Sequence, residues 1–149
     1  MKSKTGSNKA EYTIIAGCGR LGAALANSLS EAGVNVLIID IDKDAFRKLS
    51  PMYAGITLIG DATSLPMLQD AQIEKATAVI CVTNSDNTNI LIAEIAKNMY
   101  DIKRVISRLN DPERECVYHE MNIATICPTI LSINAINTLL KDNDEENRQ

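Results

Sequence analysis

The sequence of 149 residues contains no tryptophan, and aromatic residues make up only 3% of it. A hydrophobic core must therefore consist mainly of Ile, Leu, Val and Ala, within a hydrophobic content of 46%. The single histidine and the four widely spaced cysteines, without a C-x-x-C pair, suggest neither a zinc site nor a disulfide framework. Reduced thiols in a cytoplasm agree best with this pattern.

Long apolar runs and basic stripes are also missing. No run approaches the ~20 apolar residues that span a bilayer, and the polar, basic start of the chain lacks the apolar segment of a signal peptide. Since the net charge is −4, binding of nucleic acid is not expected. We predict a flexible arm over residues 1–10, one folded domain over residues 11–141 and a charged tail over residues 142–149.

A glycine-rich loop follows the first apolar run. Residues 12–16 are typical of a buried parallel strand, and they end in G-x-G-x-x-G, directly before a predicted helix over residues 21–32. In this pattern the first glycine permits a tight turn, the second lets a pyrophosphate approach the backbone, and the third lets the helix pack closely on the sheet. The helix N-terminus then attracts the phosphates. The predicted contacts are Gly17, Cys18, Gly19, Arg20, Leu21 and Gly22.

An acidic residue ends the second apolar run, residues 34–39. Asp40 lies about 20 residues beyond the glycine loop, where an acid accepts hydrogen bonds from ribose hydroxyls. A carboxylate there repels a 2′-phosphate, and the neighbouring Ile41 and Asp42 offer no arginine to hold one. NAD, NADH or an adenine mononucleotide is therefore favoured over NADP. The alternative is a strand–helix turn that binds nothing, because the glycine pattern alone is a weak signal.

Four further apolar runs, residues 56–59, 78–82, 104–107 and 124–127, alternate with helical segments. Helices are predicted over residues 43–49, 65–71, 87–99, 112–121 and 129–141. The alternation predicts a Rossmann-like α/β fold: a doubly wound, parallel six-stranded sheet of order 3-2-1-4-5-6 in an α/β/α arrangement of three layers. Ligands of such sheets bind at the carboxyl ends of the strands. Residues at these ends join the predicted site, although most are also ordinary turn residues: Asp40 and Ile41 after the second strand, and Asp61, Ala62, Thr83, Asn84 and Arg108.

Two other functions compete with a purely regulatory site. A small NAD-dependent oxidoreductase needs room for a substrate and a positioned acid or base, but the nucleotide site uses up this single domain, and His119 falls in the helix before the sixth strand. A redox sensor would use Cys18, because a thiol at a helix N-terminus has a lowered pKa. The simpler explanation of Cys18 is a small side chain that fills space in the turn. No catalytic residue and no metal ligand are predicted.

Several strings together resemble the regulatory nucleotide-binding domain of potassium transport systems, the TrkA N-terminal, KTN or RCK domain. They are G-C-G-R-L-G at 17–22, I-I-D at 38–40, G-D-A-T at 60–63, V-T-N at 82–84 followed by Asn87 and Asn89, R-V-I-S-R at 104–108 and C-P at 127–128. The resemblance implies a non-catalytic cytoplasmic regulator, peripheral to the inner face of the membrane. It also implies that the chain binds NAD(H), or AMP, ADP or ATP, and controls a membrane potassium transporter or channel.

The resemblance also implies roles for single residues. Arg20 matches the glycine-loop arginine that contacts phosphate at or across a dimer interface, and Arg108 matches a basic strand end near the phosphates. Asp40 matches the ribose acid, with Asp61 and Ala62 on the adenine side. Thr129 departs from the family, because ATP-regulated members carry a glutamate there for a divalent ion, and this favours NAD or AMP and ADP.

The last predicted helix bears on assembly. Its apolar residues cover more than one narrow stripe, so an isolated domain would leave apolar surface exposed. The resemblance implies that residues 129–141 build a homodimer or a higher ring, whereas the alternative is a helix packed on its own sheet. The sequence ends before the C-terminal lobe that is usual in the family, so it corresponds to the first lobe or to a stand-alone subunit.

Overall fold

The computed structural model describes residues 10–146. The predicted arm therefore lies, except for Ala10, outside the described residues. The described chain forms one sheet of six strands in the order β3-β2-β1-β4-β5-β6. Every neighbouring pair is parallel. The predicted Rossmann-like topology is confirmed.

The six strands are β1 (Tyr12–Ala16), β2 (Asn35–Asp40), β3 (Ile56–Ile59), β4 (Ala78–Cys81), β5 (Arg104–Arg108) and β6 (Ala124–Ile126). The α-helices are α1 (Arg20–Glu31), α2 (Leu65–Asp70), α3 (Asp86–Glu94), α4 (Glu115–Glu120) and α5 (Pro128–Glu146). Short 3-10 helices, η1 (Lys43–Lys48), η2 (Ile73–Lys75) and η4 (Pro112–Arg114), lie in the crossovers, and a π-helix, η3 (Ile95–Met99), continues α3. Within residues 10–146, no helix combines the length and apolar character needed to cross a membrane.

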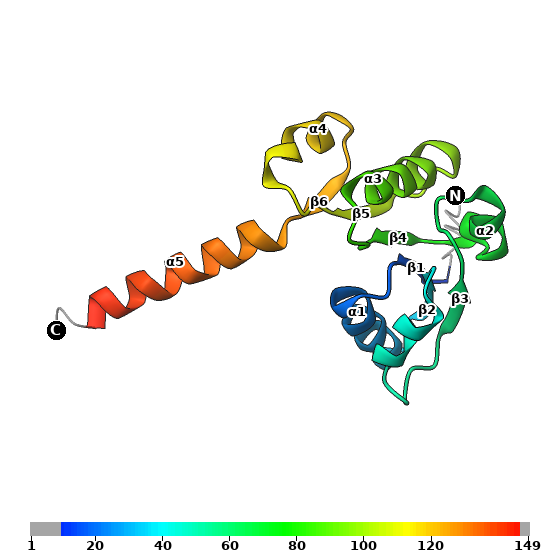
Figure 1. The fold of residues 1–149 in the computed structure, drawn as a ribbon, viewed down its shortest axis with the longest axis horizontal. Helices are drawn as coiled ribbons and strands as arrows, with labels where there is room; N and C mark the ends of the chain where they lie inside the picture. The colour runs from blue at the N-terminus through cyan, green and yellow to red at the C-terminus, as the bar shows by residue number, and fades with distance from the viewer. Residues whose placement is uncertain (1–9, 147–149) are drawn as a thin grey trace, which may run out of the picture.

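Helices α1 and α3 lie on opposite sides of the sheet (Figure 1). Two apolar clusters join these layers to the sheet. On one face, Ile15 of β1 packs with Ala26 of α1. On the other face, Ile14 packs with Leu68 of α2 and Ile92 of α3. All five side chains are fully buried. Successive strand residues point to opposite faces, so a strand covered on both sides is apolar throughout, which is the pattern that predicted a parallel sheet.

Helix α5 differs most from the prediction. It begins at Pro128 and extends to Glu146, rather than ending at Lys141. Proline is accepted in a first helical turn because its missing N–H needs no partner there, and no Gly or Pro follows to end the helix. The predicted end of the helix at Lys141 is therefore wrong, because the helix continues through residues 142–146 of the charged segment, and residues 147–149 lie outside the described part.

Helix α5 also projects away from the sheet (Figure 1). Ile130, near its start, packs against a small cluster around Leu109 and Tyr118. The apolar side chains further along are 51–64% exposed, namely Leu131, Ile133, Ile136, Leu139 and Leu140. The alternative of a last helix packed on its own sheet is therefore wrong for most of α5.

Candidate functional site

A cavity of about 420 Å³ lies at the carboxyl ends of β1, β2, β3 and β4. This is the edge at which the sequence places a ligand, and the switch between the two halves of the sheet lies there, between β1 and β4. Nine of the predicted site residues line the cavity: Gly17, Cys18, Gly19, Asp40, Ile41, Asp61, Ala62, Thr83 and Asn84. The fold therefore brings together residues from four separate strand ends.

The glycine loop forms one wall of the cavity. Gly17 adopts a φ of +108°, which favours glycine, and its N–H donates to the carbonyl oxygen of Ile39 (2.9 Å). A Cβ on Gly17 would also lie 2.9 Å from backbone atoms of Val82 and Thr83, so the loop packs directly on that peptide. Gly19 is different, because a Cβ there would meet no atom within 4 Å. The space beside Gly19 is therefore open to a ligand.

The Asp40 carboxylate is anchored where β2 meets the glycine loop. Its Oδ2 accepts a hydrogen bond from the N–H of Cys18 (2.7 Å), and its Oδ1 accepts one from the N–H of Asp42 (2.8 Å). An ionised carboxylate has about four lone-pair sites, so acceptor capacity remains for ribose hydroxyls. The predicted ribose acid is thus held in a defined orientation before any ligand arrives.

Asp61 lies on the β3 side of the same cavity. Its Oδ1 accepts hydrogen bonds from the hydroxyl (2.7 Å) and the N–H (2.9 Å) of Thr63. These bonds, the side-chain bond first, lower the pKa of Asp61 below its ordinary value. The cavity therefore carries carboxylates at two strand ends, while Ile41, 72% exposed, provides an apolar surface at its rim.

Four predicted residues do not line the cavity. Arg20 is exposed at the start of α1, Leu21 packs in the cluster beneath α1, and Gly22 is buried against the loop. The Nε of Arg108 is buried and, among the described residues, has no hydrogen-bond partner. The N–H groups of Arg20, Leu21 and Gly22 lie in the first turn of α1 and therefore have no acceptor within the helix. A nucleotide contact at these four positions stays a prediction.

Sequence reasoning missed Lys48, which lines the cavity from η1. The crossover after Asp40 folds back so that Ala45 and Lys48 reach the glycine loop, where Ala45 accepts a hydrogen bond from Cys18. A cation near a predicted phosphate site is a recognisable signal. Lys48 could not be predicted from the sequence, because helical spacing alone does not show which side of so short a helix faces the glycine loop.

The environment of Cys18 contradicts the redox-sensor hypothesis. Its side chain is fully buried, and Sγ donates to the carbonyl oxygen of Ala45 (3.4 Å). Burial raises the pKa of the Cys18 thiol, the Asp40 carboxylate raises it further, and Lys48 opposes this shift. The expected lowering of the pKa is therefore wrong, because burial and the nearby Asp40 carboxylate raise it.

Thiol labelling tests this assignment. In the native protein, Cys18 is expected to react with an alkylating reagent at least roughly tenfold more slowly than the exposed Cys116, because the Cys18 thiol is buried and its pKa is raised. Peptide mass spectrometry over a time course gives both rates, and labelling in denaturant should make them similar. Equal rates in the native protein would contradict the assignment.

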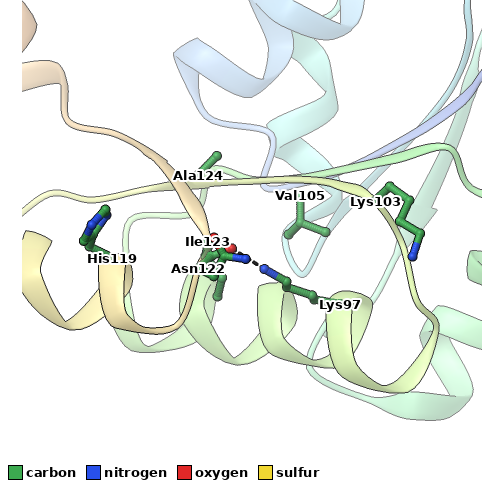
Figure 2. A pocket seen from close by; sticks show the side chains of 7 residues that line it. All are labelled: Lys97, Lys103, Val105, His119, Asn122, Ile123 and Ala124. Carbon is green, nitrogen blue, oxygen red and sulfur yellow. Dashed lines mark hydrogen bonds between the residues drawn. The ribbon is translucent and has the colours of Figure 1, made fainter.

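His119 lies in a different part of the molecule. It lines a second hollow of about 380 Å³ together with Lys97 and Lys103, at the amino ends of β5 and β6 (Figure 2). In this hollow the Lys97 ammonium group points toward Asn122 and donates to its carbonyl oxygen. The only histidine of the sequence is thus at the edge of the sheet opposite the cavity, away from Asp40.

Comparison with known proteins identifies the family. The TrkA-N domain matches residues 13–128 of the chain. The chain belongs to the TrkA-N family. The resemblance noted in the sequence is confirmed, and the matched residues of this TrkA-N domain include every strand of the sheet except for Tyr12, the first residue of β1.

Two relatives are potassium uptake proteins. The TrkA-N domain is 37% identical over 115 residues to the Trk system potassium uptake protein TrkA of Streptomyces coelicolor, covering 77% of this chain and 52% of that protein. It is 34% identical over 110 residues to the TrkA homolog of Pyrococcus abyssi, covering 74% and 48%. The chain therefore spans about half the length of the curated relatives it matches.

Solved structures show the same fold. The GsuK channel bound to NAD superimposes with a TM-score of 0.77 at 26% identity, covering 91% of this chain and 24% of that chain. GsuK bound to ADP gives 0.76 at 26% identity, covering 92% and 35%. The TrkA-N domain of inner membrane protein ybaL from Escherichia coli gives 0.78 at 16% identity, covering 89% and 98%, and so supports the fold alone.

Proposed function

We propose that this TrkA-N domain binds NAD(H) or an adenine nucleotide and thereby regulates a membrane potassium transporter or channel. The main support is the position of the Asp40 carboxylate, which the N–H groups of Cys18 and Asp42 hold beside the open space at Gly19. That arrangement supplies a ribose acceptor and a phosphate space in one cavity. GsuK, of the same fold, is described in complexes with NAD and with ADP, and relatives are named potassium uptake proteins.

The proposed role is regulatory rather than catalytic. An oxidoreductase would need an acid or base beside the nicotinamide, whereas His119 lies in the hollow at the opposite edge of the sheet (Figure 2). We propose that nucleotide binding changes the geometry of an assembly built through α5, in the cytoplasm at the inner face of the membrane. A nucleotide can shift that assembly only by the difference between its affinities for the two states.

Calorimetric titration with NAD, NADH, NADP, ATP, ADP and AMP, with and without Mg²⁺, tests the proposal. We expect binding of NAD(H) or an adenine nucleotide that is tighter than binding of NADP, insensitive to Mg²⁺ and without consumption of NADH. Absence of binding to every nucleotide would overturn the proposed function. Steady NADH oxidation in the presence of a carbonyl substrate would favour the oxidoreductase instead.

Asp40→Asn tests the ribose contact. Loss of a hydrogen bond to a charged acceptor is expected to weaken NAD binding by roughly 10- to 100-fold and to reduce the preference over NADP. Asp44→Asn is the matched control, since Asp44 is exposed in η1, does not line the cavity, and its exposed ion pair with Arg47 (3.5 Å) contributes little. Equal NAD affinity in the two variants would contradict the role given to Asp40.

A further inference from the structure

The side chain of Asn89, in α3, is fully buried, and both its oxygen and its nitrogen form hydrogen bonds with residues at the ends of β4 and β5. Its Oδ1 accepts from the N–H (2.9 Å) and the hydroxyl (2.6 Å) of Thr83, and its Nδ2 donates to the carbonyl oxygens of Thr83 (3.0 Å) and Arg108 (3.1 Å). A buried carboxamide is costly unless it is satisfied in this way. One side chain therefore binds both main-chain groups of Thr83 and joins them to the end of β5.

The bridged peptide is also a wall of the cavity. Val82 and Thr83 line the cavity, and the Gly17 turn packs directly on the peptide between them. Asn89 does not line the cavity, although Thr88 and Ile92 of the same helix do. The Asn89 carboxamide therefore holds this peptide from the side away from the cavity, and the glycine loop packs on the same peptide.

The same bridge replaces ladder bonds that the sheet does not supply. The pairing of β4 with β5 ends at Cys81 and Ser107, and the Asn89 side chain spans the residues just beyond it. Asp86, one turn earlier on α3, fixes the next segment, because its carboxylate accepts from the N–H groups of Asn110 (2.7 Å) and Asp111 (3.0 Å). Although partial burial opposes its ionisation, these donors lower the pKa of Asp86. The start of α3 therefore ties the cavity wall to the segment that leads towards α4, β6 and α5.

We propose that Asn89 is a positioning residue of the nucleotide site. Its carboxamide binds the N–H and the carbonyl oxygen of Thr83, which sets the Val82–Thr83 peptide against the glycine loop, and its bond to the Arg108 carbonyl oxygen links Thr83 to β5. The inference rests on the proposed nucleotide function. Asn89 touches no ligand in this arrangement, so its effect on affinity passes through the cavity wall. In this proposal Arg108 contributes through its main chain, because its carbonyl oxygen accepts the second hydrogen bond from Asn89.

The test compares Asn89→Asp with Asn98→Asp. The first swap is isosteric and keeps the acceptor for Thr83, but it leaves at least one of the two carbonyl oxygens without its donor. The second makes the same chemical change at an exposed position of η3, the continuation of the same helix. We expect Asn89→Asp to weaken NAD binding roughly three- to thirtyfold, and Asn98→Asp to leave it unchanged. Calorimetry at a temperature where both variants are folded gives the ratio.

Amide hydrogen exchange of the ligand-free variants separates local positioning from general destabilisation. Two N–H groups flank the bridge: that of Val82 donates to Ala16 (2.8 Å), and that of Leu109 donates to Ile126 (2.9 Å). Asn89→Asp should reduce protection at these two sites more than in the rest of the sheet. An even loss of protection, or wild-type NAD affinity in the folded variant, would overturn the inference.

The two proposals fail in different ways. If the wild-type protein binds no nucleotide, the proposed function is wrong, while the exchange pattern still decides whether Asn89 locally holds the two strand ends. If Asn89→Asp does not fold, Asn89→Ser is measured in its place, because a hydroxyl cannot reach both carbonyl oxygens. Unchanged affinity and unchanged exchange in the folded serine variant would then overturn the inference.

Discussion

Gly22→Ala is expected to destabilise the domain by about 3 kcal/mol or more. In the interior of a helix, Ala is ordinarily better than Gly by about 1 kcal/mol, so the intrinsic preference alone predicts a gain. The structure reverses the sign, because a Cβ on Gly22 would lie 1.9 Å from the carbonyl oxygen of Gly17 and 3.0 Å from its carbonyl carbon. Both atoms belong to the backbone of a turn that itself packs on Val82 and Thr83, so neither moves cheaply. Denaturant unfolding measures the change.

Gly19→Ala is the matched control in the same loop. Its φ of −76° is open to any residue and a Cβ there meets no atom within 4 Å, so the free energy of unfolding should change by no more than about 1 kcal/mol. The added methyl group would occupy the space offered to a pyrophosphate, however, so nucleotide affinity should fall in a folded protein. Wild-type stability of Gly22→Ala would contradict the close packing of α1 on the loop, and wild-type affinity of Gly19→Ala would contradict the phosphate space.

The second large effect is expected at α5. Ile136→Glu combined with Leu140→Glu is expected to weaken the proposed dimer by roughly 100-fold or more, since each buried Ile or Leu side chain contributes about 1.5–3 kcal/mol. Both side chains are more than half exposed on a helix that leaves the body of the domain (Figure 1). An apolar face of this kind needs a cover, and a second copy of the helix is the one we propose. Sedimentation velocity over a concentration series gives the dissociation constant.

Asn134→Glu combined with Thr138→Glu is the control for this pair. It adds the same charge at the same spacing, but on the polar side of α5, where both residues are also exposed. These substitutions should leave self-association unchanged, and both double variants should retain the unfolding midpoint of the domain body. A wild-type protein that stays monomeric at high concentration would contradict the proposed dimer, whereas loss of the dimer in both double variants would point to charge rather than to the apolar face.

Much of the site followed from local sequence signals. The sequence pattern predicts a tight turn at Gly17, an open approach at Gly19 and close packing at Gly22. In the structure Gly17 has a positive φ, a Cβ on Gly19 would meet no atom within 4 Å, and a Cβ on Gly22 would clash with the backbone of Gly17. Asp40 was predicted from its distance along the chain, and it stands beside the loop. The positions of these residues could be predicted because each depends on a short segment whose conformation is dictated by its own residues, within a topology that strand–helix alternation restricts to few choices. Their contacts with a nucleotide stay a prediction.

Other features depended on which distant segments meet. The Lys48 side chain reaches the cavity only because η1 folds back on the glycine loop. Asn89 belongs to a recognisable family string, yet its role appears only when Thr83 and Arg108, from two different strands, are brought to one side chain. The burial that raises the pKa of Cys18 is likewise a property of the packed layers rather than of the helix N-terminus.

Four features could be recognised from periodicity and spacing along the chain, namely the strand–helix alternation of a doubly wound sheet, the glycine loop, the acid at the end of β2 and the apolar character of the last helix. The tertiary structure decided which of the predicted residues line the cavity, how Asp40 is oriented and that α5 leaves the sheet. These outcomes depend on burial and on hydrogen bonds between residues far apart in sequence, for which local propensity carries no information.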